Sequence, residues 1–126
     1  MKLGTFMAIA AVIAFIFGLS FILAPSQLLA MYGETLDIPG QWVARYLGSA
    51  FIGIGVVNWF ARNAANDGAK RAIVLGFFVL AITGLVVALL YLTYTTGNVL
   101  SWLTIAVYVF LTLGFGYFQF TKPESA

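Results

Sequence analysis

Four long apolar stretches dominate the chain, and short polar connections separate them. The stretches cover residues 3–24, 42–61, 72–94 and 99–120. A helix needs about 20 consecutive apolar residues to cross the hydrocarbon core of a bilayer. The second stretch includes Arg45 near its start and Asn58 near its end, but it is otherwise as apolar as the others. The pattern therefore predicts four transmembrane helices.

The first connection, residues 25–41, predicts a further, shorter helix. Pro25 opens it, and Gly33 follows the apolar run 27–32. Proline suits the first turn of a helix and glycine suits its end. We expect a short interfacial helix at about residues 25–32, lying on the membrane. The side chains expected to face lipid or the bundle are Leu28, Leu29, Met31 and Tyr32.

The other two connections are short enough to form helical hairpins. Residues 62–71 contain the turn sequence Asn66-Asp67-Gly68, and residues 95–98 predict a tight turn around Gly97. The first stretch should therefore pack against the second, and the third against the fourth. The prediction is an all-α fold: one integral membrane domain, residues 1–126, built as a four-helix transmembrane bundle.

Composition agrees with a membrane protein and excludes many chemistries. Of the residues, 63% are hydrophobic and 8% are charged, whereas a soluble domain carries about 25% charged residues. Cysteine and histidine are absent, which removes disulfides, thiolate and imidazole catalysis and the usual zinc, haem and iron–sulfur ligands. The 6 basic and 4 acidic residues are too few for a nucleic-acid interface. We expect a lipid bilayer as the surroundings, with no metal, cofactor or nucleic acid.

The distribution of lysine and arginine predicts the orientation. Basic residues near transmembrane helices are retained on the cytoplasmic side. One side of the predicted bundle carries Lys2, Arg62, Lys70, Arg71 and Lys122, and the other carries Arg45. We therefore expect both termini in the cytoplasm, in the plasma (inner) membrane of a prokaryote. The first apolar stretch exceeds the usual core of a signal peptide, so cleavage is not expected.

Small residues recur at intervals of about four along three of the stretches. In lipid, helices associate largely through close packing of small residues. The set comprises Ala10, Ala14 and Gly18; Ala44, Gly48, Ser49 and Gly53; and Gly76, Gly84 and Ala88. Tight packing within the bundle is the favoured interpretation, and a homo-oligomer contact or substrate groove stays open. Asn58 is expected to form a hydrogen bond across helices.

Arg45 is the principal candidate for a functional residue. A cation at the bilayer centre costs roughly 2.5–3.5 kcal/mol on insertion scales, although Arg45 is shallower, only a few residues inside Trp42. Its side chain could extend to the interface or pair with Glu34 or Asp37 in the preceding connection. The alternative is that it binds an anion or a lipid headgroup.

A polar line on the fourth stretch offers a second candidate feature. Ser101, Thr104, Tyr108, Thr112 and Gly116 recur every three or four residues. Serine and threonine often bond only their own helix backbone, so a structural role is favoured. The alternative is a polar cavity between the second and fourth stretches. A pocket of this kind would use Arg45, Tyr46, Ser49, Tyr91, Thr104 and Tyr108.

Two segments resemble small four-span bacterial membrane proteins of the DoxX-like type. They read LAPSQLLAMYG and ARYLGSAFIGIGVVNWFARN. The similar features are the proline after the first span, the glycine before the connection and the arginine followed by glycines. The resemblance covers the order and lengths of all four spans and implies the fold more than an activity, with occasional links to oxidoreductase partners or stress responses. Small multidrug exporters need a glutamate in the first span, which this chain lacks, and fluoride channels insert in both orientations, against the charge bias here.

Two functions remain as expectations. The first is a non-enzymatic accessory or scaffold subunit that docks onto a larger membrane complex. The second is a small carrier or binding protein for a lipid-like or anionic ligand, with an outward-opening pocket around Arg45. An enzyme is not expected, because general acid–base catalysis needs a positioned, partly buried group, and every carboxylate falls in a connection or the tail. These carboxylates are Glu34, Asp37, Asp67 and Glu124.

Overall fold

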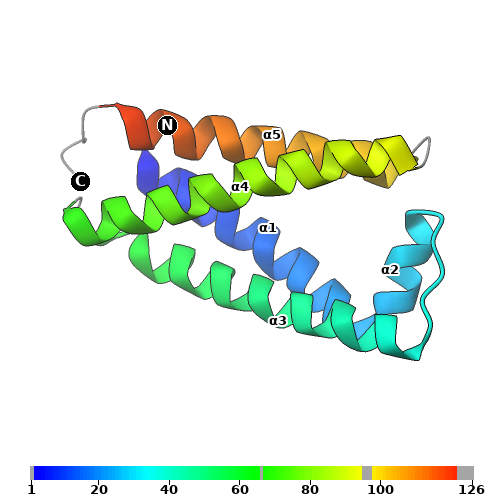
Figure 1. Ribbon diagram of the computed structural model, residues 1–126. Helices are drawn as coiled ribbons and strands as arrows, with labels where there is room; N and C mark the ends of the chain where they lie inside the picture. Colours follow the sequence, from blue (N-terminus) through cyan, green and yellow to red (C-terminus); the bar gives the residue numbers. More distant parts are fainter. Residues whose placement is uncertain (1, 66, 95–97, 122–126) are drawn as a thin grey trace. The chain divides into compact units, whose positions relative to one another are not determined.

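The computed structural model describes residues 2–65, 67–94 and 98–121, and this part of the chain is all helix and connection, without a strand. Its five helices are α1 (Leu3–Leu23), α2 (Pro25–Met31), α3 (Ile38–Ala61), α4 (Gly68–Tyr94) and α5 (Val99–Phe120) (Figure 1). Four of them, all but α2, are long and apolar enough to cross a membrane. The predicted all-α class and the four membrane-length helices are confirmed. The predicted turn around Gly97, and Asn66 and Lys122, lie outside the described residues.

Two of the long helices begin earlier than their apolar stretches. Helix α3 begins at Ile38, because the carboxylate of Asp37 accepts a hydrogen bond from Gly40 N at 2.8 Å and caps the first turn. Helix α4 begins at Gly68, where Asp67 Oδ1 accepts from Lys70 N at 3.1 Å. The predicted membrane spans, which begin at residues 42 and 72, start one turn inside these helices and stay predictions. In both cases an aspartate cap adds a more polar first turn to an apolar helix.

The short second helix is close to the prediction. Helix α2 spans Pro25–Met31, with Pro25 in its first turn and Tyr32 as its C-cap residue. Gly33 follows with a φ of 80°, a left-handed conformation that glycine adopts without strain. This glycine allows the chain to leave α2 and continue toward α3.

The chain divides into two compact units, Met1–Asn63 and Ala64–Ala126. In the first unit α1 packs along α3, and α2 contacts both helices; in the second unit α4 packs along α5. The two predicted helical pairings are therefore confirmed. A single domain spanning both units stays a prediction.

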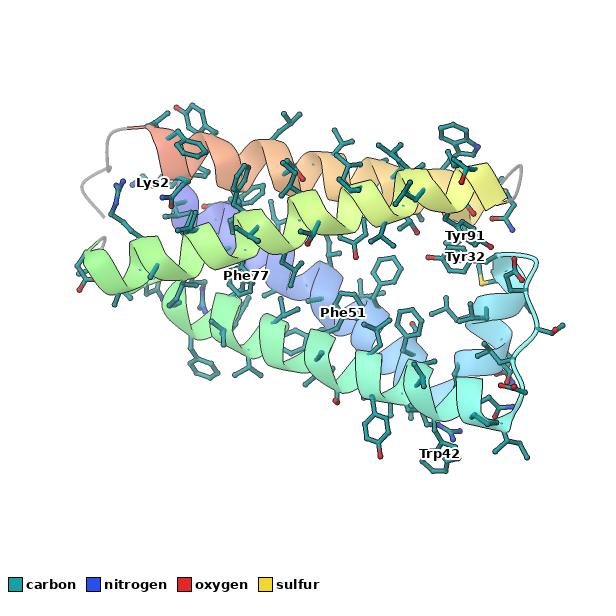
Figure 2. All side chains as sticks on the ribbon, in the orientation of Figure 1. Lys2, Tyr32, Trp42, Phe51, Phe77 and Tyr91 are labelled. Atoms are coloured by element: carbon teal, nitrogen blue, oxygen red, sulfur yellow. The ribbon has the colours of Figure 1, made fainter. Side chains whose placement is uncertain are left out.

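The first unit is held together by a small-residue and aromatic seam between α1 and α3. On α1, buried residues recur every three or four positions: Leu3, Phe6, Met7, Ala10, Ala11, Ala14, Gly18 and Phe21. On α3 the facing positions are Ala44, Gly48, Gly55 and Asn58. Phe51 of α3 (Figure 2) stacks on Phe21 of α1, with ring centroids 6.0 Å apart and an interplanar angle of 11°. Small residues therefore bring the backbones together, and large rings fill the remaining space.

The second unit uses larger side chains between its two helices. Phe77 of α4 (Figure 2) lies against Phe115 of α5 with ring centroids 5.5 Å apart. Phe78 meets Phe120 edge to face, also at 5.5 Å. Many other large apolar side chains of both units remain exposed. Such extensive exposure is unfavourable in water and natural in hydrocarbon, so the surface of each unit suits a multi-pass membrane protein.

Candidate functional site

The ends of α1 and α3 meet through two glycines, and this contact positions the candidate site. A methyl carbon built at Gly48 would lie 2.7 Å from the carbonyl oxygen of Gly18 and 2.8 Å from Cγ1 of Ile22. One built at Gly18 would lie 2.9 Å from Cδ1 of Ile52. Only glycine allows the two backbones to approach so closely. The last turn of α1 therefore lies beside the second turn of α3, which carries Arg45.

Arg45 joins the two helices through its side chain. Its Nε donates a hydrogen bond to the carbonyl oxygen of Ile22 at 3.2 Å. Ile22 lies in the last turn of α1, where carbonyl oxygens lack a partner within the helix and the helix dipole favours a cation. The guanidinium carbon lies 4.8 Å from the ring centroid of Trp42, one turn earlier on α3. Arg45 is thus half-buried between a helix end and an indole ring.

The structure does not pair Arg45 with a carboxylate among the described residues. Its interactions there are the hydrogen bond to Ile22 and the contact with Trp42. The carboxylate of Asp37 caps α3 instead, so the predicted ion pair with Glu34 or Asp37 is absent. A guanidinium has five N–H donors. One is used by Ile22, and the donors on the two Nη atoms have no protein acceptor in the described part of the chain.

The two other predicted ligand-binding residues of the first unit add little to this arrangement. Tyr46 follows Arg45 on α3, and its side chain is 73% exposed. The hydroxyl of Ser49 donates to the carbonyl oxygen of Tyr46 at 2.8 Å, so it is satisfied by its own helix. The site in this unit is therefore Arg45 with Trp42 and the end of α1.

The other half of the predicted pocket belongs to the second unit. Tyr91 is half-buried on α4, and the Thr104 hydroxyl donates to Leu100 O at 2.9 Å within α5. Tyr108 packs its ring against Gly84 of α4. The six predicted pocket residues are thus divided equally between two units that are each described by themselves. The six-residue pocket, and the cavity expected between the second and fourth stretches, stay predictions.

The rest of the polar line on α5 is bonded locally where its partners are described. Ser101 donates to Asn98 Oδ1, which also accepts from the Ser101 backbone N–H at 3.1 Å and so caps α5. The hydroxyl oxygen of Thr112 is buried without a hydrogen-bond partner in the described residues. The line therefore contributes a helix cap and a local backbone bond.

Asn58 lies on the side of α3 that faces α1 and is fully buried. Its Nδ2 donates to the carbonyl oxygen of Ile54 at 3.0 Å, one turn earlier on the same helix. Its Oδ1 is buried without a partner among the described residues. The expected hydrogen bond across helices is therefore not made within this part of the chain.

The predicted packing residues fall into two groups. Those at a described helix contact are Ala10, Ala14, Gly18, Gly48 and Gly84. Gly53 on α3 and Gly76 on α4 are exposed, and a methyl carbon at either would meet nothing within 4 Å. The four-residue spacing alone did not distinguish the two groups.

The pairing of tryptophan and arginine is the feature that reasoning from the sequence missed. Trp59 and Arg62 repeat the arrangement of Trp42 and Arg45 at the other end of α3, with the guanidinium carbon 3.8 Å from the ring centroid. Arg62 Nη1 also donates to the Trp59 carbonyl oxygen. The signal was present as a three-residue spacing in each pair, since residues three apart are neighbours on a helix. Trp42 projects from the start of α3 in Figure 2.

Metal chemistry and comparison with known proteins add no further residues to the site. Among the described residues, no group of three histidine, cysteine, aspartate or glutamate side chains could hold a metal ion. The sequence matches no protein-family model, no curated protein and no solved structure. The resemblance to DoxX-like proteins therefore stays a prediction.

Proposed function

We propose that this chain is a non-enzymatic accessory or scaffold subunit of a membrane complex in the plasma membrane of a prokaryote. The observation that carries the proposal is a small-residue face of α3 that is not used by the contact with α1, formed by Ser49 and Gly53. Both residues are exposed, and Gly53 has nothing within 4 Å. In a membrane such a face lets a neighbouring helix approach closely and gain packing contacts. The partner helix would come from a larger membrane protein.

The proposed arrangement in the membrane has four transmembrane helices with both termini in the cytoplasm. The charge bias supports it, because Lys2, Arg62, Lys70 and Arg71 fall at the same predicted side and Arg45 at the other. The chain has no cysteine, so single introduced cysteines report accessibility without background. Asp67→Cys should be labelled by an impermeant maleimide only after the cells are opened. Asn98→Cys, in the connection expected on the other side, should be labelled in intact cells, and the reverse pattern would overturn the orientation.

The docking role is tested by extracting the protein from its native membrane in mild detergent and quantifying what copurifies. A larger membrane protein in stoichiometric amount is the expected result, and a homo-oligomer without such a protein would count against the accessory role. Gly53→Leu should remove that partner, because the larger side chain would fill the small-residue face formed by Ser49 and Gly53. Val43→Leu changes another exposed position of the same helix and should leave the partner bound. If Gly53→Leu retains its partner in full, the Ser49 and Gly53 face of α3 is not the docking face.

A second candidate function is binding or carriage of a lipid-like or anionic ligand. The donors of Arg45 that lack a protein acceptor in the described residues favour it. Arg45→Ala should abolish ligand binding while the helical content stays unchanged by circular dichroism. An Arg45→Ala protein that binds and carries the same ligand as the unaltered chain would exclude this candidate.

A further inference from the structure

Helix α3 carries the same Trp–Arg pair at each of its ends. Trp42 with Arg45 and Trp59 with Arg62 both bring a guanidinium over an indole ring. The pairs are 17 residues apart, or about 26 Å along a helix that rises 1.5 Å per residue. The hydrocarbon core of a bilayer is about 30 Å thick. When α3 spans the membrane, each pair therefore lies near one boundary between hydrocarbon and headgroups, where tryptophan is enriched.

The Arg45 guanidinium lies next to exposed apolar side chains on the first two turns of α3. On the same two turns of α3, Ile38 is 71% exposed, Trp42 54% and Val43 67%. In a transmembrane helix, apolar side chains that their own unit leaves uncovered face lipid or another helix. The Arg45 guanidinium beside them is half-buried, and at a membrane boundary its charged N–H groups favour a charged acceptor. An anionic group supplied by the membrane itself would satisfy them.

Two contacts fix the position of the Arg45 guanidinium and leave its outer N–H groups available to an anion. Its Nε is held by Ile22 O at 3.2 Å, and Trp42 lies against the guanidinium at 4.8 Å. Both contacts leave the Nη donors without a protein acceptor in the described residues. The planar fork of arginine matches the oxygens of a phosphate, which it binds through two parallel hydrogen bonds.

We propose that Arg45 and Trp42 bind the phosphate group of a phospholipid headgroup at one surface of the membrane. The inference rests on the second candidate function and narrows its ligand class to a phosphate monoanion, with the lipid tails along the exposed apolar turns of α3. A headgroup phosphate is the favoured source because it lies at this depth in every phospholipid bilayer. Free inorganic phosphate has the same chemistry, and the experiment distinguishes the two. The docking face around Gly53 is not involved.

The test measures lipid retention by native mass spectrometry of the full-length protein in mild detergent. Dioleoylphosphatidylglycerol is titrated against dioleoylglycerol, which has the same tails and no phosphate. The unaltered protein should retain the phospholipid and not the diacylglycerol. Arg45→Gln should weaken phospholipid retention about ten-fold, the size expected for loss of a charge-assisted hydrogen-bonded pair. Equal retention of the two lipids by the unaltered protein would overturn the proposal.

Arg71→Gln is the matched control, since it removes one positive charge from the second unit, where Arg71 Nη2 donates to Gln119 O at 3.4 Å. It should change retention less than two-fold. If Arg71→Gln and Arg45→Gln weaken retention equally, net charge explains the binding and the specific site is wrong. Should Arg45→Gln fail to fold, Trp42→Leu tests the same site, because it keeps the Ile22 hydrogen bond and should still weaken retention two- to five-fold. Unchanged retention in Trp42→Leu would remove the indole from the site.

Three further measurements separate this inference from the proposed accessory role and from carriage of the ligand. Inorganic phosphate that displaces the phospholipid from the unaltered protein, but not from Arg45→Gln, would support phosphate chemistry at Arg45 with a soluble source. A lipid-transport assay in vesicles of phosphatidylglycerol tests separately whether the protein carries the phospholipid across the membrane. Retention that depends on Arg45 without any transport would support the lipid site and exclude a carrier. Copurification of a membrane partner should be the same for Arg45→Gln and the unaltered chain.

Discussion

Replacing Gly48 by alanine tests whether the contact between α1 and α3 is as close as the structure has it. The added methyl carbon would lie 2.7 Å from the Gly18 carbonyl oxygen, about 0.7 Å short of the 3.4 Å at which ordinary contact begins. Backbone at Gly18 cannot move aside as a flexible side chain can. The helices must separate instead, and a gap of about 0.5–1 Å forfeits a quarter to a half of each van der Waals attraction across it.

The matched control is Gly53→Ala, which makes the same chemical change five residues later in the same helix. A methyl carbon there meets nothing within 4 Å. Alanine favours a helix over glycine by about 0.5–1 kcal/mol, and this gain applies to both variants and cancels in their difference. Overpacking costs about 1–3 kcal/mol. Gly48→Ala should therefore be less stable than Gly53→Ala by about 1–3 kcal/mol.

The assay is reversible unfolding in mixed micelles, followed by circular dichroism as the fraction of denaturing detergent is raised. A difference in unfolding free energy between the two variants of less than about 0.5 kcal/mol, the scatter of surface substitutions, would refute the close approach. Gly18→Ala should behave like Gly48→Ala, because its methyl carbon would lie 3.0 Å from the Gly48 carbonyl oxygen.

Three other substitutions are checked in the same assay. Gly84→Ala should lower the free energy of unfolding by about 1–3 kcal/mol, because its methyl group would overlap the Tyr108 ring. This loss should be smaller in a Tyr108→Ala background. Equal losses in both backgrounds would contradict the contact. Asn58→Leu should leave the free energy of unfolding unchanged or raise it by about 1 kcal/mol, because it removes a buried acceptor that has no partner in the described residues. A large loss of stability would mean that the amide has an essential partner. Asp37→Ala should cost about 1 kcal/mol by removing the cap on Gly40 N, and no change would mean that the cap is not formed.

The fold was predictable where hydrophobicity decides it and less so where single polar contacts decide it. Runs of about 20 apolar residues gave the four long helices, and short connections gave the pairings. The polar first turns of α3 and α4 were not predicted, because a hydropathy pattern does not register one carboxylate that caps a helix. In each case the aspartate stands three residues before the backbone N–H that it accepts from, Gly40 for Asp37 and Lys70 for Asp67. That spacing follows from helix geometry and could have been used.

The candidate site was predictable in one respect and not in another. Arg45 stood out because a cation within an apolar stretch is costly, whatever its neighbours are. Its partner could not be foreseen, since the Ile22 carbonyl oxygen belongs to the backbone and carries no sequence signal. The acidic residues nearby in sequence suggested an ion pair, but Asp37 is used by the helix cap. Whether the Asp37 carboxylate caps α3 or pairs with Arg45 depends on the backbone geometry, and the positions of charged residues in the sequence do not give that geometry.

Gly48 and Gly53 show how one helix can serve two contacts. Residues five apart on a helix lie about 140° apart around its axis, so the two glycines cannot both face α1. The structure uses Gly48 for α1 and leaves Gly53 exposed with nothing within 4 Å. A small residue exposed to lipid gives up the side-chain contacts that a larger residue would make there, so it offers no packing advantage unless another helix approaches. Helix α3 therefore carries two small-residue positions, Gly48 toward α1 and Gly53 on a side that α1 does not use. A partner helix could pack closely at Gly53, and this is the physical basis of the proposed accessory role.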